Sequence, residues 1–538
     1  MTDPLYDVII VGAGPTGATA GNLLGQCGLS VLVVERHAAT VSEPRAVVID
    51  DEAMRTFQAV GLDEAVRRCV RVGNATRYFS KIGARHCFAE VNPQGNEFGF
   101  PKRLRFHQPD LERILHQGLR RFPRVEVLFD TACESFDAQE DGVSVRLRGT
   151  HGKAFTARSR YLLACDGGSS TIRQSLGIAL TGETYEEPWL VLDLVDDPFD
   201  PDDTLIICDP RRPAVSVPGP GRRRRFEFLI KHGEDRQSFL RPEVIERLLA
   251  PYGYGAAHPA KIERKTIYVF HARSAVSWRR GRVLLAGDAA HLMPPFMGQG
   301  MNSCIRDAHN VCWKLEQVVR GLAGERMLDT YETERRPHVE AMINISVTVA
   351  ELAMTTSRVK AALRDLAFRA ARAIPAARRY LNGQMFKPRP QYAAGLFIAP
   401  SDNAPAPVAK MLPQPQVTWK GEVQPLDKVL GSGFALLGLG TEEIPRASDH
   451  LLWRQLQPTR LELSEEPRAA DNSAAAIIQG GPLIDWLQRW RGRVLLVRPD
   501  RYVAGCFLPA EAHDFARNLA QRLQFRAPAS SRVREATV

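Results

Sequence analysis

The chain has 538 residues, of which 44% are hydrophobic and 25% are charged, a composition typical of globular proteins that predicts about three domains. Its formal net charge is +10, but the basic residues are scattered among acidic ones, so we expect small anionic ligands rather than a nucleic acid. No apolar run reaches the roughly 18 residues of a membrane-spanning helix, so we expect no membrane association.

The segment YDVIIVGAGPTGATAGNLLGQCGLSVLVVERH has the pattern of a dinucleotide-binding unit. Gly12, Gly14 and Gly17 lie between a short apolar run and a helical stretch, and Glu35 follows the next apolar run. Glycines at this spacing allow a tight turn and a close approach to a diphosphate, and an acid about 20 residues further on can accept from a ribose hydroxyl. The predicted elements are a strand over 8–11, a helix over 16–26 and a strand over 31–34.

Two later apolar runs, each predicted to be a strand, are followed directly by an aspartate. RYLLACDGGSSTIR contains Asp166, and GRVLLAGDAAH contains Asp288. Ligands bind at the carboxyl ends of the strands in such sheets. After Asp288 comes the connector GDAAHLMPPFMGQGMNS (residues 287–303), whose prolines and glycines let a backbone pass close to a ligand. A helix is predicted after it, over about 301–320.

The rest of the chain divides into segments that differ in composition and residue pattern. Short alternating runs split by proline and glycine predict an antiparallel sheet over 188–268. A stretch rich in proline and alanine, 385–425, is typical of a linker. We therefore predict an α/β fold, a Rossmann-like dinucleotide-binding domain with an inserted antiparallel-sheet domain and a small C-terminal domain. The expected segments are 1–187 (with about 76–100 given to the inserted domain), 188–268, 269–384, the linker 385–425, and 426–538.

The nine cysteines contain no Cys-x-x-Cys pair, and no histidine or carboxylate set completes a metal site at Cys304 and Cys312, so we expect reduced thiols and no metal. The N-terminal segment lacks the basic and small-residue features of a secretory signal, and a cytoplasmic location is expected.

Three motifs in order, GAGPTG, CDGGSSTIR and GDAAHLMPPFMGQGMN, resemble those of the single-component (class A) FAD-dependent aromatic hydroxylases of the para-hydroxybenzoate hydroxylase type. The resemblance covers about residues 5–390. Four further segments, PRAVVIDDEAMRTFQAVGL, EFGFPKRLRFHQPDLERIL, ICDPRRPAVSV and RRFEFLI, resemble relatives that act on 3-(3-hydroxyphenyl)propionate. The C-terminal part is similar to the thioredoxin-like domain of phenol-hydroxylase relatives. It lacks Cys-x-x-Cys, which favours a structural or homodimer-forming role.

The resemblance implies FAD as cofactor, NADH or NADPH as reductant and dioxygen as co-substrate. One hydroxyl would enter a phenolic ring ortho or para to an existing one, through a flavin C4a-hydroperoxide; 3-(3-hydroxyphenyl)propionate and 3-hydroxycinnamate are the expected kind of substrate. The backbone of the connector would pass against the flavin ring, and the dipole of the following helix would favour negative charge there. The cofactor-binding residues implied are Gly12, Gly14, Pro15, Thr16, Gly17, Glu35, Arg36, Arg45, Gln108, Asp166, Asp288, Pro295, Gly298, Gly300, Met301 and Asn302.

The catalytic residues are less defined. The Pro295 carbonyl matches a family position at the reacting centre, and His271 and Asp50 are candidate acceptors of the phenol proton. The favoured alternatives are structural: His271 packed or hydrogen-bonded at the strand end, and Asp50 paired with a nearby arginine. Arg225, together with Glu227 on the same strand face, would steer movement of the flavin. A substrate carboxylate favours an arginine clamp, for which Arg211 and Arg212 are available.

Two other functions fit the same motifs. A tailoring hydroxylase of a larger polyketide or antibiotic substrate would share the fold and the cofactor. A non-catalytic flavin- or ligand-binding protein would bind FAD without turning over a phenol, but it would not need the connector kept free of bulky side chains.

Overall fold

The computed structural model describes residues 5–40, 43–185, 187–402, 404–446, 448–465 and 475–525. The outer ends of the first and last expected segments, 1–4 and 526–538, lie outside these residues.

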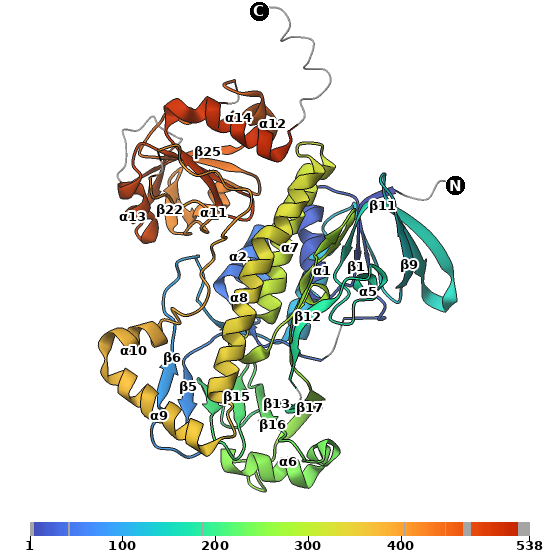
Figure 1. Cartoon of the computed structure of the whole chain (residues 1–538), viewed down its shortest axis with the longest axis vertical. Helices are drawn as coiled ribbons and strands as arrows, with labels where there is room; N and C mark the ends of the chain where they lie inside the picture. The colour runs from blue at the N-terminus through green and yellow to red at the C-terminus, as the bar shows by residue number, and fades with distance from the viewer. Residues whose placement is uncertain are drawn as a thin grey trace, which may run out of the picture.

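A mostly parallel sheet, on the right of Figure 1, carries the predicted dinucleotide turn. Its strands 8–11 and 31–34 are fully buried runs of valine, isoleucine and leucine, because helices cover both faces. The neighbouring strands β1, β2 and β11 are parallel, so the residues that follow them meet at one edge of the sheet. In order, the strands are β19 (Arg279–Arg280), β20 (Val283–Leu285), β11 (Ala154–Ala164), β1 (Leu5–Val11), β2 (Val31–Val34) and β8 (Val125–Leu128), with β10 (Val143–Arg148) and β9 (Ala132–Ala138) added antiparallel beside β11.

Helix α1 (Pro15–Gln26) begins one residue before its predicted start and packs on α7 (Gly300–Val319) and α4 (Gln108–Leu119). Helix α7 confirms the helix expected after the connector. It runs beside the long α8 (Asp329–Ala353) through the middle of the molecule (Figure 1). The remaining helices of this part are α2 (Asp51–Ala59), α3 (Asp63–Arg67), α5 (Thr171–Ser175), α9 (Arg358–Ala373) and α10 (Pro375–Asn382).

A second sheet, at the lower end of Figure 1, corresponds to the predicted insertion and is called the lower sheet below. Its strands pair antiparallel except β14 and β5, which are parallel. One face packs Phe226 and Phe228 under α6 (Pro242–Leu249), which leaves the opposite face free to line a cavity. The order is β17 (Lys261–Tyr268), β13 (Trp189–Val195), β16 (Arg224–Leu229), β15 (Ala214–Pro218), β14 (Thr204–Ile207), β5 (Thr76–Phe79) and β6 (Ala89–Val91).

Two small sheets join these layers. One has the order β12 (Leu180–Thr184), β18 (His271–Ala275) and β21 (His291–Leu292), and the other β3 (Val48–Ile49), β7 (Leu104–Arg105) and β4 (Arg71–Val72).

The C-terminal domain, at the top of Figure 1, is built on a mixed sheet. The expected linker contains its first hairpin, because β22 and β23 lie within 416–425. Lys420 and Gly421 have φ of 51° and 83°, which suits the tight turn of such a hairpin. The order is β23 (Glu422–Pro425), β22 (Gln416–Trp419), β26 (Ala475–Ile478), β25 (Thr459–Ser464), β24 (Ala435–Leu439), β27 (Val494–Val497) and β28 (Val503–Phe507), with helices α11 (Leu426–Leu430), α12 (Leu451–Leu456), α13 (Pro482–Arg489) and α14 (Ala512–Leu523).

Buried ion pairs connect the C-terminal domain to α7 and α8. Arg498, after β27, contacts Glu334 of α8 at 2.8 Å and also contacts Asp500. Lys314 of α7 lies 2.8 Å from Glu334. The Arg498, Glu334 and Lys314 side chains are fully buried, so each depends on the others for charge compensation.

The Glu334 carboxylate should make stability depend on acid pH. Burial alone would raise the pKa of Glu334, but Arg498 and Lys314 outweigh it and lower the pKa to about 2. A lowered pKa in the folded state stabilises the fold above the ordinary value near 4.5; this stability is lost as pH falls towards 2 and amounts to about 3 kcal/mol. We expect the difference in unfolding free energy between wild type and Glu334→Gln to shrink over that window. Denaturant titrations at pH 7 and below 4 measure it, with the exposed Glu422→Gln as control; a constant difference would contradict the prediction.

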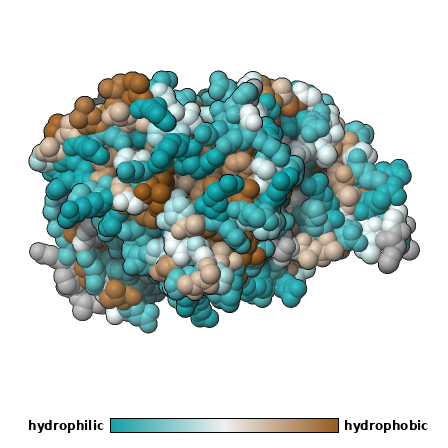
Figure 2. Space-filling model, turned by 90° about the horizontal axis from the view of Figure 1, so that it is seen from below, coloured by the Kyte–Doolittle hydropathy of each residue, from teal (hydrophilic) through white to brown (hydrophobic). Residues whose placement is uncertain are grey.

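The surface seen in Figure 2 is mainly hydrophilic, with apolar side chains in separate patches. Exposed apolar residues on α9 are Val359, Leu363 and Leu366. Within the described ranges, no helix has the length and apolar character needed to cross a membrane. All nine cysteines are free thiols.

Candidate functional site

A cavity of about 560 Å³ lies between the carboxyl ends of the parallel sheet and the free face of the lower sheet. It brings together residues that are far apart in the chain, and most of the expected site residues line it. Gly17, Asp50 and Asn302 do not. The expected residues in the lining are Gly12, Gly14, Pro15, Thr16, Glu35, Arg36, Arg45, Gln108, Asp166, Arg225, Glu227, His271, Asp288, Pro295, Gly298, Gly300 and Met301.

The three glycines of the first turn have different surroundings. Gly12 has a φ of +98°, and a Cβ there would lie 2.3 Å from the Cys165 carbonyl oxygen. A Cβ on Gly17 would lie 1.9 Å from the Gly12 oxygen, so Gly17 serves close helix–strand packing. Gly14 differs, because nothing lies within 4 Å of its Cβ position and it borders the cavity. This open space before the first turn of α1 fits a diphosphate, which the free amides of a helix N-terminus favour.

Acidic side chains border the same end of the cavity. Glu35 accepts from the backbone amides of Ala13 at 2.9 Å and His37 at 3.0 Å, so it is fixed in place with lone pairs remaining for a ribose hydroxyl. Asp166 accepts from the Ile172 amide through one oxygen, while its other oxygen is buried without a partner. A buried carboxylate oxygen of this kind fits a hydroxyl donor from a bound cofactor.

The connector follows the expected course along the cavity. The 3-10 turns η4 (Gly287–Ala289) and η5 (Pro295–Met297) precede Gly298, which has a φ of +63° and packs on Val48. Asn302 is buried outside the lining. Its amide donates to the carbonyls of Gly298 at 2.7 Å and Val48 at 3.2 Å. Its side chain therefore positions the connector, and the expected contact of its backbone with the cofactor stays a prediction.

His291, in the same motif, is structural. Its Nε2 lies 2.6 Å from Asp307, a buried carboxylate on α7 that also accepts from Arg335 at 2.9 Å. The Gly287 amide donates to the same carboxylate. Asp307 thus joins the start of the connector to α7 and α8.

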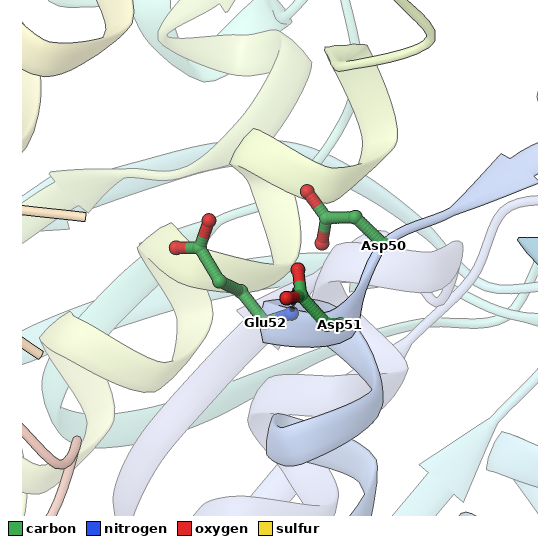
Figure 3. A group of neighbouring side chains, drawn as sticks. All are labelled: Asp50, Asp51 and Glu52. Carbon is green, nitrogen blue, oxygen red and sulfur yellow. Dashed lines mark hydrogen bonds between the residues drawn. The ribbon is translucent and has the colours of Figure 1, made fainter. Parts of the chain in front are cut away.

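Asp50 belongs to a group of three buried acids, Asp50, Asp51 and Glu52, at the start of α2 (Figure 3). Burial opposes ionisation of Asp50, but Arg306 and Lys387 hold the pKa of its carboxyl well below the usual range. Its side chain also caps α2 by accepting from the Ala53 amide. An acid held so firmly in its charged form accepts a proton poorly, and this placement speaks against Asp50 as the acceptor of the phenol proton.

The same group has the ligand types of a metal site, but protein cations already neutralise it. Arg306 contacts Glu52 at 2.8 Å, and Lys102 lies 3.1 Å from Asp51. Burial raises the pKa of Asp51 to about 6, and Lys102 opposes that rise. These contacts favour a brace between α2 and α7 over a cation site.

Arg45 and Arg225 meet where the lower sheet reaches the cofactor end. Gln108 accepts from the amides of Arg45 at 3.0 Å and Ala46 at 2.8 Å. Arg225 pairs with Asp193 at 2.7 Å and donates to the Arg45 carbonyl at 2.6 Å. This buried guanidinium therefore connects the lower sheet to the loop at 44–46.

The predicted carboxylate clamp is wrong. Arg211 pairs with Asp209 at 2.8 Å, and Arg212 pairs with Glu234 at 2.6 Å, both away from the cavity. Two other arginines line the cavity instead. Arg103 and Arg105 come from the segment before α4, and nothing in their local sequence distinguishes them from surface arginines.

Comparison with known proteins agrees with this site. Residues 5–346 match the family model described as FAD binding domain, and 409–522 match the HcaD C-terminal domain. The chain is 38% identical to the 3-(3-hydroxy-phenyl)propionate/3-hydroxycinnamic acid hydroxylase of Shigella sonnei (strain Ss046), over 97% of this chain and 95% of that one. The protein of the same description from Escherichia coli (strain SMS-3-5 / SECEC) is also 38% identical, over 93% and 92%.

Solved structures share the architecture. The flavin-dependent monooxygenase PieE, in complex with FAD and substrate, has a TM-score of 0.82 at 22% identity, over 97% of this chain and all of that one. OxyS anhydrotetracycline hydroxylase from Streptomyces rimosus has a TM-score of 0.73 at 25% identity, over 98% and 100%. With the glycine turn, the connector and the aspartates on one cavity, these likenesses place the chain in a family. It belongs to the class A FAD-dependent aromatic hydroxylases, flavoprotein monooxygenases that use NAD(P)H and dioxygen.

Proposed function

We propose that the protein hydroxylates a small phenolic acid, of the 3-(3-hydroxyphenyl)propionate or 3-hydroxycinnamate kind, ortho or para to its existing hydroxyl. The observation that carries the proposal is a cavity that joins the dinucleotide turn to the lower sheet, in a chain 38% identical to hydroxylases described as acting on those acids.

FAD would be held by the residues around the open space at Gly14, with Glu35 and Arg36 at the adenosine end and Asp166 and Asp288 nearer the flavin. The bound flavin supplies the hydride acceptance and the activation of dioxygen that side chains lack. The chain's own part is to orient the ring, exclude water and manage one proton. In the connector the Pro295 carbonyl and the start of α7 would face the reacting ring.

His271 is the proposed proton acceptor. Its Nδ1 lies 3.0 Å from the Thr184 hydroxyl, and its ring lines the cavity. Partial burial, then Arg273, lowers the pKa of His271. The imidazole is therefore neutral near pH 7 and can take the phenol proton, which makes the aromatic ring more nucleophilic.

Replacing His271 by asparagine tests this role. We expect kcat/KM at pH 7 to fall about 100-fold, and to recover as the pH approaches about 10, where a phenol ionises without help. The pH profile of product formation measures it, with the exposed His258→Asn as control. A loss that is equal at every pH would remove His271 from the proton step.

Arg225 is proposed to couple substrate binding to the flavin, because it contacts the loop that carries Arg45. Glu227, beside it on the cavity face, is buried, and burial raises the pKa of its carboxyl. If Glu227 gains or loses its proton when the substrate binds, the charge beside Arg225 changes. This change of charge would help the flavin to move between two positions.

The C-terminal domain is proposed to be thioredoxin-like and to serve structure rather than redox chemistry. The order β25, β24, β27, β28, with β27 antiparallel to β24, supports the topology. Its cysteine, Cys506, is buried and has no partner cysteine in that domain. The expected domain boundaries and the homodimer remain predictions.

The function is tested by product analysis and peroxide detection during oxidation of NADH or NADPH by the purified FAD protein. We expect 3-(3-hydroxyphenyl)propionate or 3-hydroxycinnamate to accelerate oxidation and give a catechol or hydroquinone with little peroxide. If only a bulky polycyclic phenol is hydroxylated, the tailoring function is correct. If no phenol changes the rate, the protein is a flavin-binding protein without this activity.

A further inference from the structure

The lower sheet offers the cavity an apolar strip beside a cationic edge. Tyr78 pairs in register with Ile206, and Ile206 pairs with Val215. All three line the cavity and form a strip on which an aromatic ring can lie. Next to the strip, Thr76 pairs with Thr204 on the same face.

Arg103 and Arg105 reach this threonine pair from β7 and the residues before it. The Arg103 guanidinium donates to the Thr76 hydroxyl at 2.6 Å, and Arg105 donates to the Thr204 hydroxyl. Arg105 is only 3% exposed, and its Nε is buried without a hydrogen-bond partner. Both side chains line the cavity, so their remaining donors are available to a ligand there.

Neither guanidinium group has a carboxylate partner among the residues that the structure describes. Burial, then the neighbouring Arg103, lowers the pKa of Arg105 to about 9, and no carboxylate of the described residues opposes that effect. Burial likewise lowers the pKa of Arg103. Other buried arginines behave differently, since Arg335 contacts Asp307 and Arg498 contacts Glu334. A buried cation, Arg105, beside the half-buried Arg103 is costly without an anion, and a bound carboxylate would remove that cost.

The cationic edge also has a defined place relative to the connector. Arg105 pairs with Val48 across β7 and β3, and Gly298 of the connector packs against Val48. An acid held at Arg105 would therefore have its ring on the apolar strip, one strand away from the connector.

We propose that Arg103 and Arg105 bind the carboxylate of the aromatic substrate and select phenolic acids over uncharged phenols. This inference rests on the proposed function and adds to it the residues that set its specificity. Arginine suits the role because its planar donors match the two oxygens of a carboxylate.

The experiment compares two ligands that share a phenol ring and differ in charge, 3-(3-hydroxyphenyl)propionate and 3-ethylphenol. Their dissociation constants are measured on the FAD-loaded protein from the change in flavin absorbance. In Arg105→Met we expect the constant for the acid to rise on the order of 100-fold, and that for 3-ethylphenol to change less than about 3-fold. Arg105→Lys should lose less, and Arg211→Met, a matched change at an exposed arginine, should match wild type.

Thermal unfolding gives a second readout. Because the Arg105 charge is uncompensated without ligand, Arg105→Met should melt at the same temperature as wild type or higher. The acid should raise the melting temperature of wild type and not that of the variant.

The outcomes separate the two proposals. If wild type hydroxylates the acid but Arg105→Met keeps the same preference for it over 3-ethylphenol, the inference is wrong and the function stands. Equal weakening of both ligands, or a lower melting temperature without ligand, would mean that Arg105 only supports the fold. If wild type binds neither ligand, both proposals fail.

Discussion

Replacing Arg498 by alanine lowers the free energy of unfolding by about 3–5 kcal/mol. The change leaves Glu334 and Asp500 with less compensation in a fully buried place. It also removes the guanidinium that lies 4.9 Å from the Trp313 ring and 4.8 Å from the Phe397 ring. Both carboxylates are buried, Glu334 on α8 and Asp500 in the C-terminal domain, so water does not replace the lost guanidinium.

The measurement is chemical denaturation of the FAD-loaded protein, followed by both flavin fluorescence and tryptophan fluorescence. Arg517→Ala is the matched control, because its ion pair with Asp514 is exposed and such pairs contribute about 0–1 kcal/mol. An Arg498→Ala protein as stable as this control would show that the buried contact does not hold the domains together.

Replacing Gly14 by valine weakens FAD binding at least 100-fold while the protein still folds. Nothing lies within 4 Å of a Cβ at this position, and its φ is −65°, so a side chain is compatible with the backbone and the packing. The added methyl groups would occupy the space before α1 that fits the diphosphate, and would keep it from the free amides of the helix.

FAD affinity is measured by titrating the apoprotein and following flavin fluorescence, and folding by circular dichroism. Gly255→Val is the control, because a Cβ there also meets nothing within 4 Å and the residue lies outside the cavity. Unchanged FAD affinity in Gly14→Val would place the diphosphate elsewhere. Loss of folding would show that the space at Gly14 is needed by the protein itself.

The parts of the site that depend on local pattern could be predicted from the sequence. A valine- and isoleucine-rich strand, a glycine turn and a helix follow one another within about 20 residues around Gly12, and each step has its own signal. The connector and α7 are predictable for the same reason. The hairpin at 416–425 also has a recognisable pattern, alternating residues on both sides of Lys420–Gly421. The proline-rich sequence around it favours a linker instead.

The parts that depend on distant partners could not be predicted. Asp50 differs from a catalytic acid through Arg306 and Lys387, which are 256 and 337 positions away in the chain. Arg103 and Arg105 differ from surface arginines because no carboxylate of the described residues pairs with them. Which carboxylates lie near a side chain depends on the fold and cannot be seen in the local sequence. Arg211 was a poor candidate for a clamp, because Asp209, two residues earlier, neutralises it.

Helix α7 begins at the cofactor cavity with Gly300, and further along it contributes Lys314 to the charges shared with the C-terminal domain. Its 20 residues span about 30 Å. A chimaera that exchanges the C-terminal domain for that of another hydroxylase would have to carry a matching arginine for Glu334. Without one, the mismatch would act on the same rigid helix that supports the connector, so domain exchange would alter the oxidation of substrate as well as the assembly of the chain.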